Sequence, residues 1–229
     1  MYYTTFDNIK QNLNKLEDIY TIKEPENVKH LILSNIKLIT LDKHIFYNFT
    51  QLQFLDLSEN NLNTLDKDIF KYNTQLKYLY LHHNNLIKLD KNIFSYLTHL
   101  KKLTLFSNHL KYLNKDIFKY NTMLEILYSS NNYFTYLNKD IFKYNTQLYT
   151  LSLSNNKLTL LNKNIFKYNT QLHCLFLSEN NLHKLPLSII NCIYLNKFIY
   201  HNNPINYIPP NILKFLHKSS LLNNTILNI

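Results

Sequence analysis

The sequence repeats one short pattern of leucines and asparagines at a nearly constant interval. Eight segments fit L-x-x-L-x-L-x-x-N-x-L, and successive copies begin 24 residues apart, except the last, which follows after 23. A fixed period of this size is typical of a solenoid, in which each repeat buries its apolar side only against its neighbours. The chain is therefore expected to form one elongated domain. The first apolar residues of the copies are Val28, Leu52, Leu76, Leu100, Leu124, Leu148, Leu172 and Leu195.

A single copy of the pattern already predicts a short strand. Leu55 and Leu57 alternate with Phe54 and Asp56, which is the period of a β-strand with both leucines on one side. One such strand cannot bury its apolar side alone, so the copies are expected to stack into a parallel sheet with strands about 4.8 Å apart. The leucines then form a continuous core, and the alternating residues form one outer face.

Two further positions recur in most copies. Where the chain leaves the strand, an Asn amide can both donate to and accept from the backbone of a turn, which predicts a ladder of side-chain hydrogen bonds. The ladder residues are Asn60, Asn84, Asn108, Asn132, Asn156, Asn180 and Asn203. Behind the strands we predict a stacked column of core rings formed by Phe46, Phe70, Phe94, Phe118, Phe142 and Phe166. Because the chain has no Gly, Asn is expected to fill the left-handed turn positions.

These residues resemble leucine-rich repeats of the typical 24-residue class, over about residues 28–216. The resemblance implies an α/β-type solenoid, a horseshoe with a parallel concave β-sheet of about eight short strands and convex segments that are irregular, 3-10 or short helical. One departure is Asn in place of the family's last convex Leu, at Asn73, Asn121, Asn145 and Asn169. Abundant Asn, Lys and Ile imply an AT-rich codon bias. Together with a short array without cysteine-rich caps, this composition resembles that of leucine-rich-repeat gene families of insect poxviruses and giant viruses.

The chain divides into three parts. Residues 1–27 are expected to form a helical N-terminal cap, because apolar residues recur at helical spacing over 5–20. Residues 28–210 hold the eight repeats, and residues 211–229 form a C-terminal cap with a short helix at about 211–218. Such caps shield the terminal core faces of a solenoid.

The copies differ from one another mainly at the outward strand positions. The segments that lead from the end of one strand back to the start of the next, which we call the return segments, are near copies, as at 66–75 and 138–147. The outward strand positions vary and are often aromatic. Exposed aromatic residues are enriched at binding hot spots, so the concave face is the candidate site for a partner protein. The alternative is composition alone, since aromatic residues also fit strands. The candidate residues are Phe54, Asp56, Tyr78, Tyr80, His82, Lys102, Phe106, Tyr128, Tyr149 and Phe176.

Two copies depart from the pattern where a core Leu is expected. Ser129 occupies this position in the fifth copy and Tyr200 in the eighth. By analogy with other large-to-small core changes, Ser129 should weaken its layer by about 2–4 kcal/mol relative to Leu. Either the repeat has drifted, or Ser129 produces a local kink that reshapes the concave face.

The formal net charge of +10 makes nucleic acid a partner to consider. Many lysines, however, recur beside aspartates in the return segments, as Lys67 does between Asp66 and Asp68, and such mixed rows are typical of solvated faces. Arg, which is best suited to bidentate contacts with bases and phosphates, is absent. The sequence therefore favours a protein partner over nucleic acid.

Neither a metal site nor an active site can be assembled from the sequence motifs. His82 and His83 would face opposite ways in a strand, and His201 with Cys174 supplies only two ligands of a zinc site. No Ser-His-Asp arrangement, H-E-x-x-H motif or Gly-rich phosphate loop is present. We therefore expect no metal, no cofactor and no enzyme activity.

The remaining features bear on location and function. The sequence has neither an apolar stretch of about 18 residues nor a basic start followed by an apolar core, so no membrane span or signal peptide is predicted. Two cysteines, Cys174 and Cys192, fit a reducing compartment, which predicts a cytoplasmic protein. The leading hypothesis is a module that binds a partner protein, as a viral protein engaging host factors. The alternatives are an inhibitor that wraps an enzyme and a structural or surface-display protein without a soluble partner.

Overall fold

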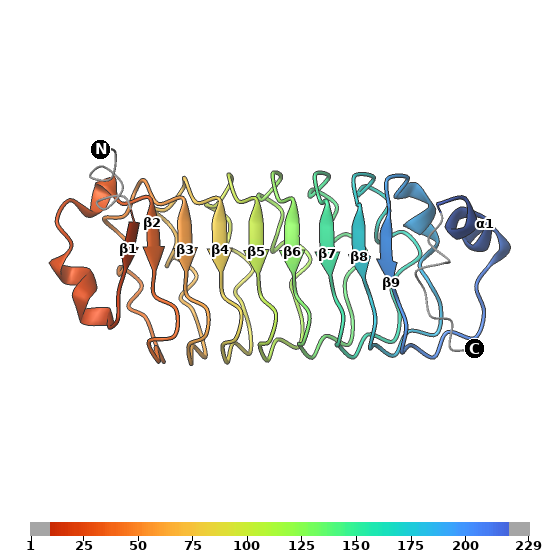
Figure 1. Cartoon of the computed structure of the whole chain (residues 1–229), viewed down its shortest axis with the longest axis horizontal. Coiled ribbons are helices and arrows are strands. Elements are labelled where there is room, and N and C mark those ends of the chain that lie inside the picture. The colour runs from red at the N-terminus through yellow and green to blue at the C-terminus, as the bar shows by residue number, and fades with distance from the viewer. Residues whose placement is uncertain (1–9, 220–229) are drawn as a thin grey trace, which may run out of the picture.

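The computed structural model describes residues 10–219, which form one solenoid on a single parallel sheet. Figure 1 shows the strands side by side in chain order, from the N-terminal cap (red) to α1 (blue). The predicted parallel solenoid is confirmed, and β1 adds one strand to the eight expected from the repeats. The strands are β1 Lys10–Asn12, β2 His30–Ile32, β3 Phe54–Asp56, β4 Tyr78–Tyr80, β5 Lys102–Thr104, β6 Ile126–Tyr128, β7 Thr150–Ser152, β8 Cys174–Phe176 and β9 Lys197–Ile199.

Each repeat strand lies in register with its counterpart in the next repeat. Leu55 pairs with Leu79, and Leu79 pairs with Leu103, so the central residues of the strands form one buried row. These leucines have no exposed surface, while the residues on either side of them point outward. The period of the sequence therefore becomes the register of the sheet, and the predicted inward leucines are confirmed.

The predicted asparagine ladder joins each turn to its neighbours. The Nδ2 group of Asn108 donates to the carbonyl of Leu81 in the preceding repeat at 2.9 Å and to that of Leu105 in its own repeat at 3.1 Å. Its Oδ1 atom accepts from the backbone N–H of Leu86 at 3.0 Å. Asn60, Asn84, Asn132, Asn156, Asn180 and Asn203 make the corresponding contacts. One side chain thus satisfies backbone groups that the turn would otherwise leave buried and unpaired.

A second asparagine ladder lies in the return segments, where the sequence had shown only a departure from the family pattern. The Nδ2 group of Asn121 donates to the carbonyls of Phe94 at 2.9 Å and Leu97 at 2.8 Å, both in the preceding repeat. Asn121 has no exposed surface, and its Oδ1 atom finds no hydrogen-bond partner among the described residues. Leu97 occupies the equivalent position one repeat earlier and is also fully buried. In this second ladder the Nδ2 group of Asn121 is therefore paired and its Oδ1 atom is not, and one position of the ladder is occupied by the apolar Leu97.

Replacing one member of each ladder by Leu should separate their contributions to stability. Asn108→Leu leaves the buried N–H of Leu86 without its partner and removes one of two Asn donors from the carbonyls of Leu81 and Leu105. It is expected to lower the free energy of unfolding by about 3 kcal/mol. Asn121→Leu removes a buried unpaired oxygen together with two hydrogen bonds, so its cost is expected to stay below about 1 kcal/mol. Urea unfolding of both variants measures the difference, and equal costs would contradict this assignment.

The predicted stacking of phenylalanine rings is confirmed for the pairs Phe46–Phe70, Phe94–Phe118 and Phe118–Phe142. The centroids of Phe94 and Phe118 lie 6.2 Å apart, and those of Phe118 and Phe142 lie 6.4 Å apart, with both pairs inclined by 10°. All six predicted rings have no exposed surface. The rings fill the core between the sheet and the return segments, so those segments are held at a constant distance behind the strands.

One residue of each repeat adopts a positive φ immediately before the asparagine ladder. Asn fills this position in some repeats, but Glu59, His83, Ser107 and Glu179 fill it in others with φ between 52° and 56°. The expectation that Asn alone serves these turns is therefore wrong. The neighbouring repeat fixes the turn, since the backbone N–H groups of Glu59 and Asn60 donate to the carbonyls of His82 and His83. Tertiary hydrogen bonds thus offset the strain of a left-handed residue other than Gly.

The N-terminal cap differs from the continuous helix predicted over 5–20. Residues 5–9 lie outside the described residues, and the rest of this segment forms β1 followed by the 3-10 helix η1 Leu16–Thr21. A second 3-10 helix, η2 Pro25–Asn27, precedes the first repeat. β1 pairs with β2, while Leu13 and Ile19 join the buried core. A strand pairs the backbone groups of the sheet edge, which a helix of the same residues would leave open.

The C-terminal end follows its prediction more closely. Helix α1 Pro210–Lys218 buries Ile212 and Leu216 and packs against the 3-10 helix η3 Leu187–Asn191. The short helix expected at 211–218 is therefore confirmed. The domain limits at residues 27/28 and 210/211 stay predictions.

The repeat that contains Ser129 carries a second change that offsets the first. Phe134 stands where the neighbouring repeats have Leu110 and Leu158, and both Ser129 and Phe134 have no exposed surface. Strand β6 keeps its register with β5 and β7, so the sheet shows no slip at this repeat. A larger ring in a layer that has lost a leucine side chain conserves the core volume. The register therefore favours compensated drift over the alternative of a local kink.

This compensation predicts a coupled effect of two substitutions. Ser129→Leu should overfill the layer and Phe134→Leu should leave it underfilled, whereas the double variant recreates the arrangement of the other repeats. We expect the double variant to be more stable than the sum of the single changes by about 1–3 kcal/mol. Urea unfolding of the four proteins in a double-mutant cycle measures this coupling, and strictly additive changes would rule the compensation out.

Candidate functional site

The outward residues of the strands and of the segments directly flanking them form one continuous surface, which we call the sheet face. All ten candidate residues lie on it and are at least partly exposed. Tyr78 and Tyr149 are the most exposed aromatic members, at 38% and 45% of their surface. The structure therefore exposes these side chains on the outer side of the sheet, and their role in binding stays a prediction.

Seven of the ten residues lie together on β3–β6 and the turns that follow these strands. We call this group the aromatic platform. Its members are Phe54, Tyr78, Tyr80, His82, Lys102, Phe106 and Tyr128.

Direct ring contacts hold the platform together. The Phe54 ring meets the Tyr80 ring edge-on with centroids 5.0 Å apart, and it meets the Tyr78 ring at 6.4 Å. The Tyr80 ring in turn contacts the His82 ring at 5.9 Å. His82 stacks on Phe106 with centroids 4.3 Å apart and the planes inclined by 20°. Offset and edge-on pairs of this kind stabilise aromatic clusters beyond simple burial, so the platform is a packed, largely pre-formed surface.

Lys102 places a positive charge within the platform. Its Nζ atom lies 4.9 Å from the centroid of the Tyr80 ring and 5.7 Å from that of the Tyr128 ring. Both distances fall within the range of cation–π attraction. Lys102 takes part in none of the ion pairs formed by the described residues. The charge is thus held between two rings, without a carboxylate partner.

Asp56 borders the platform, but its carboxylate is already engaged within its own repeat. Its Oδ1 atom accepts from the backbone N–H of Ser58 at 2.9 Å and from the Ser58 hydroxyl at 2.6 Å. Asp56 therefore stabilises its own turn. Its charge also acts on the platform, because it opposes the lowering of the pKa of the neighbouring His82 by burial.

His82 is the titratable ring of the platform, and its surroundings favour the neutral form. Its Nδ1 atom lies 2.8 Å from the hydroxyl of Thr104, a residue that sequence reasoning did not select. Partial burial lowers the pKa of His82 from its ordinary value of 6.5, while the charge of Asp56 acts in the opposite direction. At neutral pH the platform therefore carries the charge of Lys102 beside an uncharged imidazole.

The lowered pKa of His82 predicts a pH dependence of stability. Because the unfolded chain binds this proton more readily than the folded chain, the contribution of His82 is present above pH 6.5 and is lost as the pH falls toward the folded pKa. Wild-type protein should therefore lose more free energy of unfolding between pH 7.5 and 5.5 than His82→Gln does. Urea titrations at both pH values measure the difference, and a larger loss in the variant would contradict it.

Tyr149 and Phe176 belong to the sheet face but make no ring contact with the platform. The Tyr149 ring stacks on the His173 ring at 4.1 Å, and His173 continues to Tyr194 at 5.5 Å. Phe176 lies beneath the Nζ atom of Lys197 at 5.4 Å. Tyr149 directly precedes β7, whose outward residues Thr150 and Ser152 are small and buried, and Phe176 lies on β8 beyond them. The structure therefore divides the predicted site into an aromatic platform and two separate groups.

Two histidines extend the platform beyond the predicted residues. The His30 ring lies 5.7 Å from the Phe54 ring, and the His83 ring meets the Phe106 ring edge-on at 5.1 Å. His82 and His83 do not face opposite ways as expected, because both follow β4 and His83 has a φ of 52°. Their rings lie 5.5 Å apart. His30 occupies the same strand position as Phe54 and was detectable from the pattern, whereas His83 depended on the turn conformation.

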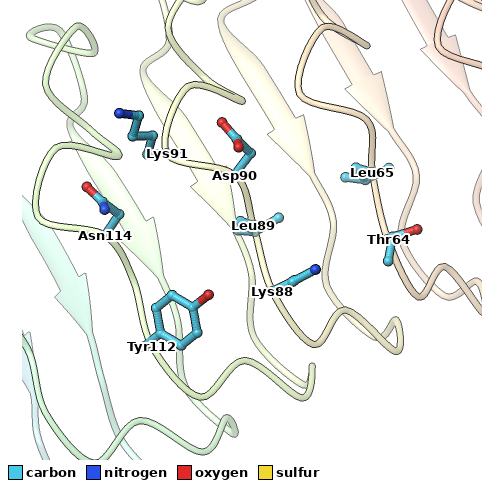
Figure 2. A pocket seen from close by; sticks show the side chains of 8 residues that line it. All are labelled: Thr64, Leu65, Lys88, Leu89, Asp90, Lys91, Tyr112 and Asn114. Atoms are coloured by element: carbon cyan, nitrogen blue, oxygen red, sulfur yellow. The ribbon is translucent and has the colours of Figure 1, made fainter.

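A separate open pocket of about 370 Å³ lies outside the sheet face, on the segments that follow the asparagine ladder. Figure 2 shows Thr64, Lys88 and Tyr112 on three successive turns of this pocket. Asp90, Lys91 and Asn114 complete its polar lining, and none of the candidate residues contributes to it. Its side chains form no arrangement of nucleophile and base, so it is a surface hollow between repeats.

Other site chemistry is sparse among residues 10–219. No group of three or more His, Cys, Asp or Glu side chains in this range is arranged to hold a metal ion. Cys174 and Cys192 are both free thiols, and burial raises the pKa of Cys192 to about 12, so this thiol is protonated at neutral pH. Within the same range, no helix is sufficiently long and apolar to cross a membrane.

The fold and its turn ladder define the class of protein as a parallel-stranded repeat solenoid, and the family comparisons agree. A family model described as Leucine rich repeat matches residues 26–86, 55–110 and 74–134 in overlapping segments. A second model, described as BspA type Leucine rich repeat region (6 copies), matches residues 105–222, just over half of the chain. The chain belongs to the leucine-rich-repeat family. No curated protein sequence matches it significantly.

Solved structures share this architecture over most of the chain. The "Crystal structure of TLR13-ssRNA13 complex" matches with a TM-score of 0.79 and 25% identity, covering 91% of this chain and 30% of that chain. An internalin (inlF) from Listeria monocytogenes matches with a TM-score of 0.66 and 19% identity, covering 82% of this chain and 52% of that chain. The chain thus spans about a third and about a half of these two proteins, and the internalin match concerns the fold alone.

Proposed function

We propose that this protein is a non-enzymatic interaction module that binds a partner protein through the aromatic platform. The observation that carries the proposal is the packed cluster of partly exposed rings on β3–β6, centred on Phe54, Tyr80, His82 and Phe106. Such a cluster combines large contact area with little side-chain freedom left to lose on binding. A surface of this kind is typical of the anchor region of a protein–protein interface.

The contrast between the two sides of the solenoid supports this choice. Tyr72, Tyr120, Tyr144 and Tyr168 recur at one position of the return segments, each beneath the Lys that precedes it. The platform residues instead differ from repeat to repeat. A codon bias toward Tyr acts on both sides alike, so it does not account for a non-repeating cluster that packs ring against ring. The variable side therefore suits recognition, and the repeating side suits a scaffold.

Nucleic acid is the competing ligand class, because one structural neighbour was solved as a TLR13-ssRNA13 complex. Rings could stack on bases, but binding of single strands also needs a groove of cations that follows the phosphates. Lys102 is the one cation of the platform. The nearby Lys77 and Lys101 are engaged with Gln53 and Glu125. The charge arrangement thus favours a protein partner.

The proposal also covers the cellular location and the biological role of this module. A cytoplasmic location accords with the two free thiols, and a role as a viral protein that engages host factors rests on the AT-rich composition alone. Its alternative is a structural or surface-display protein without a specific soluble partner. An inhibitor that wraps an enzyme would be one form of the binding module.

Removing the platform rings should abolish capture of the partner while the solenoid stays folded. The test variant replaces Tyr78, Tyr80, Phe106 and Tyr128 by Ser, and the matched control replaces Tyr72, Tyr120, Tyr144 and Tyr168 by Ser. In affinity capture from lysate of the producing cells, partner recovery should fall at least about tenfold for the test variant, as expected for hot-spot residues. The control should recover wild-type amounts.

Circular dichroism and thermal unfolding of both variants exclude loss of the fold as the cause. Equal capture by wild type and the platform variant would refute the proposal. Loss of capture in the control alone would move the site to the return segments. Self-association of the wild type, seen in size-exclusion chromatography, together with no captured protein would support the structural alternative.

A further inference from the structure

The lysines near the centre of the sheet face differ in how their charges are compensated. Lys101 forms an ion pair with Glu125 at 2.9 Å, and Lys77 donates to the side-chain carbonyl of Gln53 at 3.2 Å. Lys102 has only ring faces around its Nζ atom, 4.9 Å from the Tyr80 centroid and 5.7 Å from the Tyr128 centroid. It is therefore the central cation of the face that lacks a polar side-chain partner among the described residues.

The platform supplies Lys102 with no internal counter-ion. Asp56, on β3, lies two strands from β5, so the two side chains start roughly 10 Å apart. The Asp56 carboxylate also accepts two hydrogen bonds from Ser58. Of the other acidic residues near this part of the sheet, Glu125 is paired with Lys101, and Glu59 lies on the turn after β3, where its charge acts on His82. A partner that covers Lys102 without an anion would bury an uncompensated charge, which is costly.

The surroundings of Lys102 also limit the kind of anion. Phosphate recognition favours Arg forks or several converging donors, whereas Lys102 offers one point charge in a chain without Arg. The Tyr80 and Tyr128 rings on either side offer apolar contact to whatever lies beside the anion. One carboxylate with neighbouring apolar or aromatic side chains matches this combination.

We infer that the partner places an Asp or Glu side chain on Lys102, flanked by aromatic or large apolar side chains that lie on Tyr80, Phe106 and Tyr128. This inference rests on the proposed function, since it specifies the partner chemistry of the same platform. In this arrangement Lys102 selects an acidic segment of the partner, and the surrounding rings provide most of the contact area. Electrostatic complementarity of this type acts mainly on specificity and association rate.

The probe for this inference is a library of random 12-residue peptides displayed on phage and selected on the immobilised full chain. Peptides that fail to bind the Tyr78, Tyr80, Phe106, Tyr128→Ser variant define the platform binders. These should be enriched in Asp or Glu next to Phe, Tyr, Trp or Leu. Their synthetic forms, and versions with each Asp or Glu changed to Asn or Gln, are then measured by isothermal titration calorimetry at two salt concentrations.

Matched variants isolate the charge of Lys102 from its packing. Lys102→Gln should weaken binding of the acidic peptides about tenfold and reduce its salt dependence, while Lys102→Arg should retain most of the affinity. Lys115→Gln removes an equal charge from a return segment, where Lys115 pairs with Asp116, and should leave binding unchanged. The amide form of the peptide should bind wild type and Lys102→Gln equally, because both changes remove the same interaction.

The outcomes separate this inference from the proposed function. Platform binders without acidic enrichment, or with equal affinity for wild type and Lys102→Gln, would overturn the role of Lys102 and leave the platform as a protein-binding surface. A library in which every binder tolerates the fourfold Ser variant would overturn the proposed function itself. Displacement of platform binders by a 12-nucleotide oligo(U) RNA at comparable concentration would replace the acidic segment with nucleic acid.

Discussion

The hydrogen bonds of the buried asparagine amides are the interaction on which the rest of this structure depends. Each repeat leaves its strand after three residues and turns within the core, where backbone donors and acceptors have no access to water. Asn84 pairs such groups by donating to the carbonyls of Leu57 and Leu81 and accepting from the N–H of Leu62. The side chain therefore ties its own turn to the preceding one. Every other regularity, including sheet register and ring column, requires that this turn be repeated without slippage.

Because the ladder fixes the turn from the neighbouring repeat, the residue before each ladder Asn is free to vary. Glu59, His83, Ser107 and Glu179 all take a positive φ there, although each would avoid it in isolation. The same freedom applies to the outward strand positions, whose side chains play no part in the core. A rigid interior and a variable exterior are thus two results of one constraint. In this chain the variation has gathered aromatic rings on β3–β6 and small hydroxyl residues on β7.

How far the sequence could predict this structure depended on whether a feature repeated. The inward leucines, the asparagine ladder and the column from Phe46 to Phe166 recur at constant spacing, so their stacking followed from period alone. The second ladder did not follow, because Asn73 and its counterparts looked like a departure from Leu until their contacts with neighbouring carbonyls were seen. The helix prediction for residues 10–20 was wrong. Apolar residues there recur at helical spacing, but the edge of the assembled sheet offers backbone pairing to a strand, and this edge is not visible in the sequence.

The candidate site shows the same division. Alternation placed Phe54, Tyr78 and Tyr80 on the outer face, yet no sequence rule showed that Phe54 would meet Tyr80 more closely than Tyr78. Side-chain rotamers and the left-handed turn at His83 decided which rings touch, and both depend on neighbours 24 residues away. Tyr149 lies outside the platform, because it precedes its strand and stacks on His173.

The size of the platform constrains how it can work. Four strands span roughly 14 Å across the sheet, and the outward positions extend roughly 13 Å along it, which gives an area of about 180 Å². A stable protein–protein contact covers about 800 Å² on each partner. The platform can therefore act only as the anchor of a larger footprint. The groups around Tyr149 and Phe176 lie on the same sheet face and provide further surface for this footprint. A compact ring cluster that contains one cation and lies within a larger footprint has the arrangement of a binding hot spot.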